Sequence, residues 1–213
     1  MGTVPSQHDL ETDLEQWHLR LQRYPNDPRA YIQRGMAHFK LAHIDASITD
    51  FDQAERLRPD VTPYLWQRGL SYYYAGRFRD GARQFEIDLR VNAQDAEETL
   101  WRSLCLAQVD GQEAARRSLP PACTDPRPAL RTIIYPLYAG LSSPDAALAE
   151  GNSLDPAGQF YVHLYVGLYY EAAGQPEAAI APITHAVAQY PSDDYMWHLA
   201  RVHCHLRSTS KMR

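Results

Sequence analysis

The sequence predicts an all-α fold of stacked helix pairs, a solenoid. Three observations predict it: a 34-residue period, glycines and prolines that recur in the frame of that period, and no stretch with the pattern of a β-strand. Gly35 and Gly69 lie 34 residues apart, and Phe51 matches Phe85 at the same offset. A period of this length is typical of helical hairpins that stack, because one hairpin cannot bury its apolar face alone.

Small residues mark the same places in each period. Gly35, Gly69 and Gly167 sit in the middle of the first helix of a pair, where a small side chain lets the second helix approach closely. Gly76 and Gly174 follow that first helix, as Ala42 does in the first period, where glycine readily takes a left-handed conformation. We therefore expect helix–turn–helix repeats over 28–61, 62–95 and 160–193.

These features resemble the tetratricopeptide repeat family, whose 34-residue unit has small residues at fixed positions and a proline near its end. Pro59 and Pro191 occupy that last place here, and proline cannot continue a helical hydrogen-bond ladder. The resemblance implies a right-handed superhelix that works as a scaffold or adaptor for another protein, without a cofactor.

The remaining segments are predicted as helices of less regular form. Residues 8–24 read as a lone amphipathic helix with Leu14, Trp17 and Leu21 on one face. Residues 96–154 read as degenerate pairs, in which Pro136 should kink or divide a helix. Residues 194–208 read as a capping helix. We expect one domain over 8–208, with flexible termini at 1–7 and 209–213.

Composition limits the classes of function. The net charge is −5 with no basic stripe, which argues against nucleic acid as a partner. No apolar run approaches the length that crosses a bilayer, and Cys105, Cys123 and Cys204 form no disulfide pattern. A cytoplasmic location is expected, or an organelle after loss of a transit peptide. Gly2 and Ser6 match the N-myristoylation pattern, although one acyl chain gives only marginal membrane binding.

The densest group of chemically active side chains is the stretch HLARVHCHL. On a helix His198 and His205 share a face, but His203 and Cys204 point elsewhere, and no third ligand stands at usable spacing. The sequence also lacks a glycine-rich phosphate loop and a nucleophile elbow. We therefore predict no enzyme, no cofactor and no metal site, with metal binding by this helix as the remote alternative.

Asp88 departs from the repeat pattern, because it stands where the other repeats have Ala54 and Ala186. A buried carboxylate needs a partner. The sequence predicts an ion pair with Arg68 or Arg90, or else a local splaying of the helix that leaves Asp88 in contact with water.

The candidate binding surface is the concave face. The family's pattern places Tyr72 in the packing between helices but Tyr73 and Tyr74 on that face, where the lining is apolar and aromatic. Family members that hold acidic chaperone tails use lysine and asparagine at these positions, so such a tail is not expected here. The predicted concave-face residues are Ile32, Met36, Phe39, Lys40, Trp66, Leu70, Tyr73, Tyr74, Tyr161, Leu164 and Leu168.

Three occupants of this surface remain open. An amphipathic helix or peptide of a partner is one, the usual ligand of a helical groove. The chain's own terminal helix or middle segment is another, and a second copy in a homodimer is the third. In layout the chain also resembles NlpI-type adaptors, which are dimeric, although no lipid-attachment cysteine lies near its start.

Overall fold

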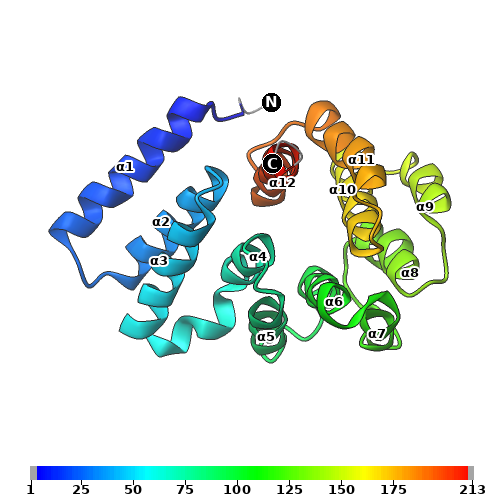
Figure 1. Ribbon diagram of the computed structural model, residues 1–213, viewed down its shortest axis with the longest axis horizontal. Helices are drawn as coiled ribbons and strands as arrows, with labels where there is room; N and C mark the ends of the chain where they lie inside the picture. The colour runs from blue at the N-terminus through cyan, green and yellow to red at the C-terminus, as the bar shows by residue number, and fades with distance from the viewer. Residues whose placement is uncertain (1–3, 211–213) are drawn as a thin grey trace. The chain divides into compact units, whose positions relative to one another are not determined.

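The computed structural model describes residues 4–210, and among these the chain is all α-helical with short 3-10 and π-helical turns and no strand (Figure 1). Gly2, on which the myristoylation prediction depends, lies outside the described residues. Consecutive helices pair as antiparallel hairpins, so the predicted all-α fold of stacked helix pairs is confirmed. No helix of the described part is long and apolar enough to span a membrane.

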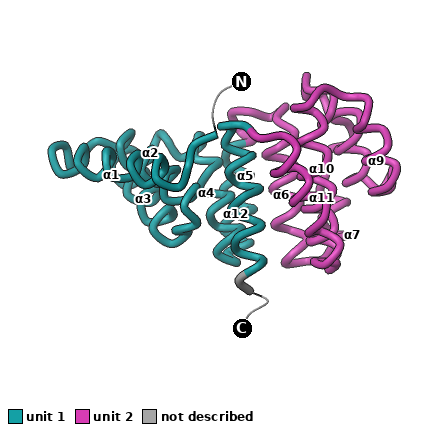
Figure 2. Tube along the Cα trace, turned by 90° about the horizontal axis from the view of Figure 1, so that it is seen from above, with its two compact units in different colours: residues 1–88, 192–213 teal, residues 89–191 magenta. Residues whose placement is uncertain are grey.

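The chain forms two compact units rather than the single domain that we expected over 8–208. Unit 1 comprises residues 1–88 and 192–213, and unit 2 comprises residues 89–191 (Figure 2). The C-terminal helix therefore belongs to the unit built by the N-terminal helices.

Unit 1 contains the first two predicted repeats. Ser6 caps its first helix in a capping box with Asp9, and Asp27 caps the second helix through the amides of Arg29 and Ala30. Its helices are α1 (Gln7–Arg23), α2 (Pro28–Lys40), α3 (Ile44–Leu57), the 3-10 helix η1 (Pro59–Tyr64), α4 (Trp66–Tyr74), α5 (Phe78–Asp88) and α12 (Tyr195–Ser210).

The glycines of the repeat act as the spacing predicts. A Cβ atom on Gly69 would lie 2.6 Å from the ring of Phe85, so α4 and α5 approach too closely for any side chain at this position. Gly76 ends the hairpin turn with φ of 72°, the left-handed region that glycine enters at low cost. Ala42 takes the same conformation in the first repeat, with φ of 60°.

Unit 2 contains the degenerate middle and the last predicted repeat. Pro136 lies in the first turn of an α-helix that continues from a π-helical segment, so the helical geometry changes at the predicted place. The helices of unit 2 are α6 (Ala96–Asp110), α7 (Gln112–Arg117), the π-helix η2 (Ala129–Ile134), α8 (Tyr135–Tyr138), α9 (Pro144–Gly151), α10 (Pro156–Ala172) and α11 (Pro176–Gln189).

The terminal helix has the predicted extent but a different role. We expected residues 194–208 to cap an exposed end of the stack, whereas α12 packs against α2 within unit 1. The reason lies in its composition, because α12 carries large apolar side chains such as Met196, Trp197 and Leu199, all at most 5% exposed. Burial of that surface outweighs a solvated position at the end of the stack.

Candidate functional site

Five aromatic and aliphatic side chains of α2 and α4 in unit 1 are predicted for the concave face, and we call this group the inner wall. The residues of the inner wall are Phe39, Trp66, Leu70, Tyr73 and Tyr74. Phe39 and Leu70 have no exposed surface and Tyr73 is 1% exposed, whereas Trp66 is half-buried.

The first residue of α12 covers one part of the inner wall. The ring of Tyr195 stacks on Phe39 with centroids 5.4 Å apart and an interplanar angle of 20°. The same ring meets Trp66 edge-on at 5.3 Å. Aromatic pairs with these geometries stabilise a contact by about 0.5–1.5 kcal/mol each beyond area burial. Tyr195 is therefore an aromatic anchor of α12.

A second contact, two helical turns further along α12, involves Tyr74. The hydroxyl of Tyr74 and Nδ1 of His203 are 3.2 Å apart and hydrogen-bonded, and the two rings meet edge-on at 5.9 Å. The guanidinium of Arg207 lies 5.7 Å from the centroid of the Tyr74 ring, a cation–π contact. The chain's own terminal helix, one of the three occupants that the sequence left open, is thus the one seated here.

The other predicted residues of α2 are more accessible. Ile32, Met36 and Lys40 are each partly exposed. Met36 receives a weak hydrogen bond on its sulfur from the Gln67 amide at 3.8 Å. The predicted residues of α2 other than Phe39 therefore remain partly accessible along the length of the helix.

An open cleft lies between α1 and α2, and Ile32 is the one predicted residue in its lining. It encloses about 510 Å3, within the range of ordinary ligand sites. Trp17 and Ile32 give it an apolar lining, and Trp17 is held in place by a 3.0 Å hydrogen bond from its indole N–H to Asp13. The lining residues are Trp17, Arg20, Asp27, Arg29, Ala30, Ile32 and Gln33.

The rim of this cleft is charged. Arg20 donates to Asp27 at 2.9 Å and also lies 4.7 Å from the centroid of the Tyr24 ring. Partial burial opposes ionisation of Asp27, but the hydrogen bonds from Arg20 and from two backbone amides outweigh it, so the pKa of Asp27 is lowered. Sequence reasoning placed Ile32 on the binding face but assigned Trp17 only to an amphipathic helix.

A buried polar network connects α3, α4 and α5. Arg68 is 5% exposed and donates to Glu55 at 2.8 Å and to Asp52 at 3.0 Å, and its guanidinium also bonds Gln84. Gln84 in turn donates to Asp88 at 2.7 Å. The predicted direct ion pair of Asp88 with Arg68 is therefore wrong, because Gln84 stands between them.

Asp88 itself is fully buried, so the alternative of a solvated carboxylate is also wrong. Its Oδ2 has no hydrogen-bond partner among the described residues. Burial raises the pKa of Asp88 to about 7, against the smaller opposing effects of the Gln84 hydrogen bond and the charge of Arg68. The position is a source of pH-dependent stability and carries no feature of a binding site.

In unit 2 the three predicted residues of α10 differ in exposure. Leu164 and Leu168 are fully buried, and Tyr161 is half-buried and stacks on Tyr165 with centroids 6.3 Å apart. The hydroxyl of Tyr165 donates to Glu97 at 3.0 Å. Of the predicted residues in this unit, only Tyr161 offers surface.

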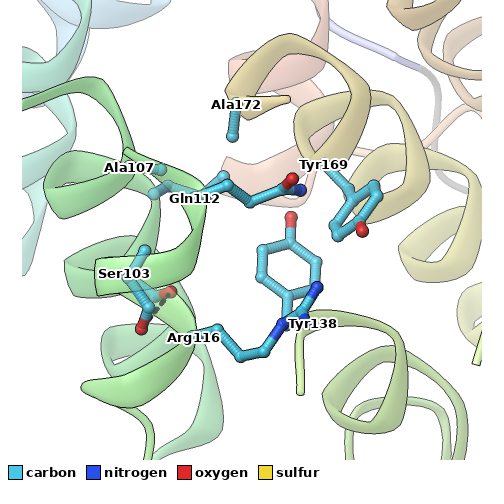
Figure 3. A pocket seen from close by; sticks show the side chains of 9 residues that line it. Ser103, Ala107, Gln112, Arg116, Tyr138, Tyr169 and Ala172 are labelled. Carbon is cyan, nitrogen blue, oxygen red and sulfur yellow. Dashed lines mark hydrogen bonds between the residues drawn. The ribbon is translucent and has the colours of Figure 1, made fainter. Parts of the chain in front are cut away.

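A small cleft lies among α6, α7, α8 and α10 of unit 2 (Figure 3). The amide of Gln112 points into it beside the hydroxyl of Tyr138, which donates to the backbone oxygen of Tyr165 at 3.0 Å. The Gln112 Nε2 atom is buried without a partner among the described residues. The free space for the centre of a water molecule is about 10 Å3, which is room for one water. The cleft fits a bridging water, not a substrate.

Acidic side chains surround Arg127 in unit 2. Arg127 pairs with Asp125 at 2.7 Å, with Asp95 at 3.4 Å and with Glu97. Asp125 also accepts from the Ala96 amide at the start of α6, so the cluster fixes that helix end. Burial raises the pKa of Glu97 to about 7, and the charge of Arg127 opposes this shift. The cluster therefore has a structural role, which is to hold the start of α6 in place.

The described residues contain no group of three or more His, Cys, Asp and Glu side chains that could hold a metal ion. On α12, His198 pairs with Asp193 at 2.9 Å and His203 bonds Tyr74, so these two histidines serve structural contacts. The three cysteines form no disulfide among the described residues, and burial raises the pKa of the Cys105 thiol, which makes it unreactive.

Together the hairpins and their spacing define a tetratricopeptide-like helical repeat fold. The sequence matches no protein-family model and no curated protein. Among solved structures the chain is similar to MamA, in the form described as the "MamA RS-1 ArsTM double mutant". The identity is 15%, the match covers 83% of each chain, and the TM-score is 0.50. This likeness supports the helical repeat fold and, at such low identity, nothing further.

Proposed function

We propose that the protein is a protein-interaction scaffold that binds a segment of a partner at the α1–α2 cleft. One observation carries the proposal. In unit 1 an open cleft of about 510 Å3 has an aromatic residue, Trp17, and an aliphatic one, Ile32, in its lining, and Ile32 is one of the residues predicted for the concave face. An apolar lining with a polar rim is the usual composition of a site for a peptide or helix.

The chemistry of the lining supports binding rather than catalysis. The titratable side chains of the cleft are Arg20, Arg29 and Asp27, and Arg20 is already paired with Asp27. A general base or nucleophile would need a group poised near neutral pH. Trp17 and Arg20 instead belong to the residue types that contribute most to binding energy at protein interfaces.

A photo-crosslinking amino acid tests this proposal. It replaces Gln33, an exposed residue that lines the cleft, or Arg83, an exposed residue of α5 that serves as the matched control. We expect the Gln33 variant to crosslink a defined protein in a lysate of the native source and the Arg83 variant not to do so. Trp17→Ala should abolish the crosslink while the helical circular-dichroism signal stays unchanged. Equal crosslinking from both positions, or a crosslink insensitive to Trp17→Ala, would refute the site.

The predicted likeness in layout to NlpI-type adaptors stays a prediction. Because those adaptors are dimers, the mass of the protein in solution should be measured alongside the crosslinking. Helix α12 is the element through which two copies could associate.

A further inference from the structure

Helix α12 completes unit 1 although residues 89–191, which form unit 2, separate it in sequence from the other helices of that unit. The contacts that join it to the inner wall are non-covalent. They are the ring contacts of Tyr195 with Phe39 and Trp66, and the contacts of His203 and Arg207 with Tyr74. Nothing in this set requires that α12 and the wall belong to the same chain.

We propose that the inner wall is a helix-receiving site that α12 of a second copy can fill, so that two chains exchange their terminal helices. Exchange replaces each intramolecular contact by the same contact between chains. Its cost is therefore limited to the entropy of association and to strain in the connecting segment, which is why domain swapping is a low-cost route to dimers. This inference concerns the inner wall and is independent of the α1–α2 cleft.

The stretch that connects α11 to α12 suits a hinge, since it consists of residues 190–194 between two helix ends and contains Pro191. Polar contacts at the start of α12 join this segment to the helix itself. Asp194 accepts from the Met196 amide at 2.8 Å, and Asp193 pairs with His198 at 2.9 Å. Because these contacts move with the helix, α12 keeps its N-terminal turn when it leaves the wall.

Recognition depends on the ring of Tyr195 rather than on its hydroxyl. The hydroxyl oxygen is buried and has no hydrogen-bond partner among the described residues. The ring makes two of the aromatic contacts that hold the helix. A phenylalanine at this position preserves both contacts, and an alanine removes both.

The test uses a full-length chain whose own α12 cannot seat. Ala200 is fully buried in the middle of α12, and Ala200→Pro interrupts the helix there. A fluorescent peptide of residues 192–210 is then added, and its anisotropy is measured. We expect one peptide to bind per Ala200→Pro chain. A peptide carrying Tyr195→Phe should bind at least as well as the natural sequence, whereas Tyr195→Ala should weaken binding by a factor on the order of 10.

Two controls accompany this test, one with a substitution in the inner wall and one with the wild-type chain. Trp66→Ala in the Ala200→Pro chain should weaken peptide binding by a similar factor. The wild-type chain should bind the peptide at least about 10-fold more weakly, because its own α12 competes for the wall. If Ala200→Pro unfolds the chain, the double variant Tyr195→Ala, Arg207→Ala replaces it, since these two changes weaken α12 without breaking its backbone.

The second copy is tested directly by light scattering on the concentrated wild-type chain. We expect a species with the mass of two chains, in a proportion that Trp66→Ala leaves about unchanged, because the contact of Tyr195 with Trp66 is present in both the closed and the exchanged form. A folded Ala200→Pro chain that does not bind the peptide overturns the helix-receiving site. Peptide binding without any dimer of the wild-type chain overturns the exchange between copies. Neither result affects the cleft, which the crosslinking at Gln33 tests separately.

Discussion

Replacing Asp88 by asparagine should stabilise the protein at alkaline pH and leave it almost unchanged at acidic pH. The carboxyl group is fully buried, accepts one hydrogen bond from Gln84, and has a second oxygen without a partner among the described residues. Burial raises the pKa of Asp88 to about 7 from a usual value near 3.8. Asparagine is similar in shape and can accept the same hydrogen bond from Gln84, but it cannot ionise.

The sign and size of the effect follow from proton linkage. Between about pH 4 and pH 7 the folded state holds a proton on Asp88 that the unfolded state has released, so the free energy of unfolding falls as pH rises through this range. A pKa difference from 3.8 to about 7 corresponds to about 4 kcal/mol at most. Relaxation of the protein around the ionised Asp88 carboxylate reduces this free-energy difference. We therefore expect the free energy of unfolding to fall by an amount on the order of 2–4 kcal/mol by pH 8.

The assay is urea unfolding of the wild-type and Asp88→Asn proteins at several pH values, followed by circular dichroism. We expect the two free energies of unfolding to agree near pH 4.5 and the variant to be more stable by about 2–4 kcal/mol at pH 8. An Asp88→Asn protein whose stability declines between pH 5 and pH 8 as steeply as that of the wild type would refute the reasoning. Asp45→Asn, at an exposed position of α3, is the matched control and should change neither value.

Three further substitutions test the packing. Gly69→Ala places a methyl group 2.6 Å from the Phe85 ring, so we expect a loss of about 1–3 kcal/mol in urea unfolding. Gly76→Ala meets no atom within 4 Å but forces alanine to φ of 72°, which should lower the melting temperature through a cost of about 1–2 kcal/mol. Tyr195→Phe removes a buried hydroxyl without a partner, and a rise in stability of about 1 kcal/mol is expected; a loss of that size would show that the hydroxyl is hydrogen-bonded.

The repeat made much of the fold predictable from the sequence. Close approach at Gly69 and the left-handed turn at Gly76 depend on local chemistry that recurs every 34 residues, and both are observed. The position of α12 depends on contacts between residues far apart in sequence, such as Tyr195 with Phe39, which no period encodes. The residue types of the inner wall could be predicted from the sequence, but the packing of α12 on these residues could not.

A comparison of the first two repeats explains the hydrogen-bond network around Asp88. In the first repeat Arg34 pairs with buried Asp50 at 2.7 Å. At the same offset of 34 residues, Arg68 bonds Gln84, so the acid of the second repeat stands one helical turn later, at Asp88. The repeat pattern marks Asp88 as unusual, but its partner becomes predictable only from the neutral residue Gln84 at the place where the first repeat has Asp50.

The central claim is that the chain's own terminal helix covers part of the inner wall of unit 1, so that a partner is proposed to bind at the α1–α2 cleft instead. Nuclear Overhauser contacts of the Tyr195 ring measure this most directly, at protein concentrations low enough to exclude exchange between chains. The account predicts cross-peaks from Tyr195 to the rings of Phe39 and Trp66, whose centroids lie 5.4 and 5.3 Å away. Well-resolved Tyr195 signals without either cross-peak would contradict it.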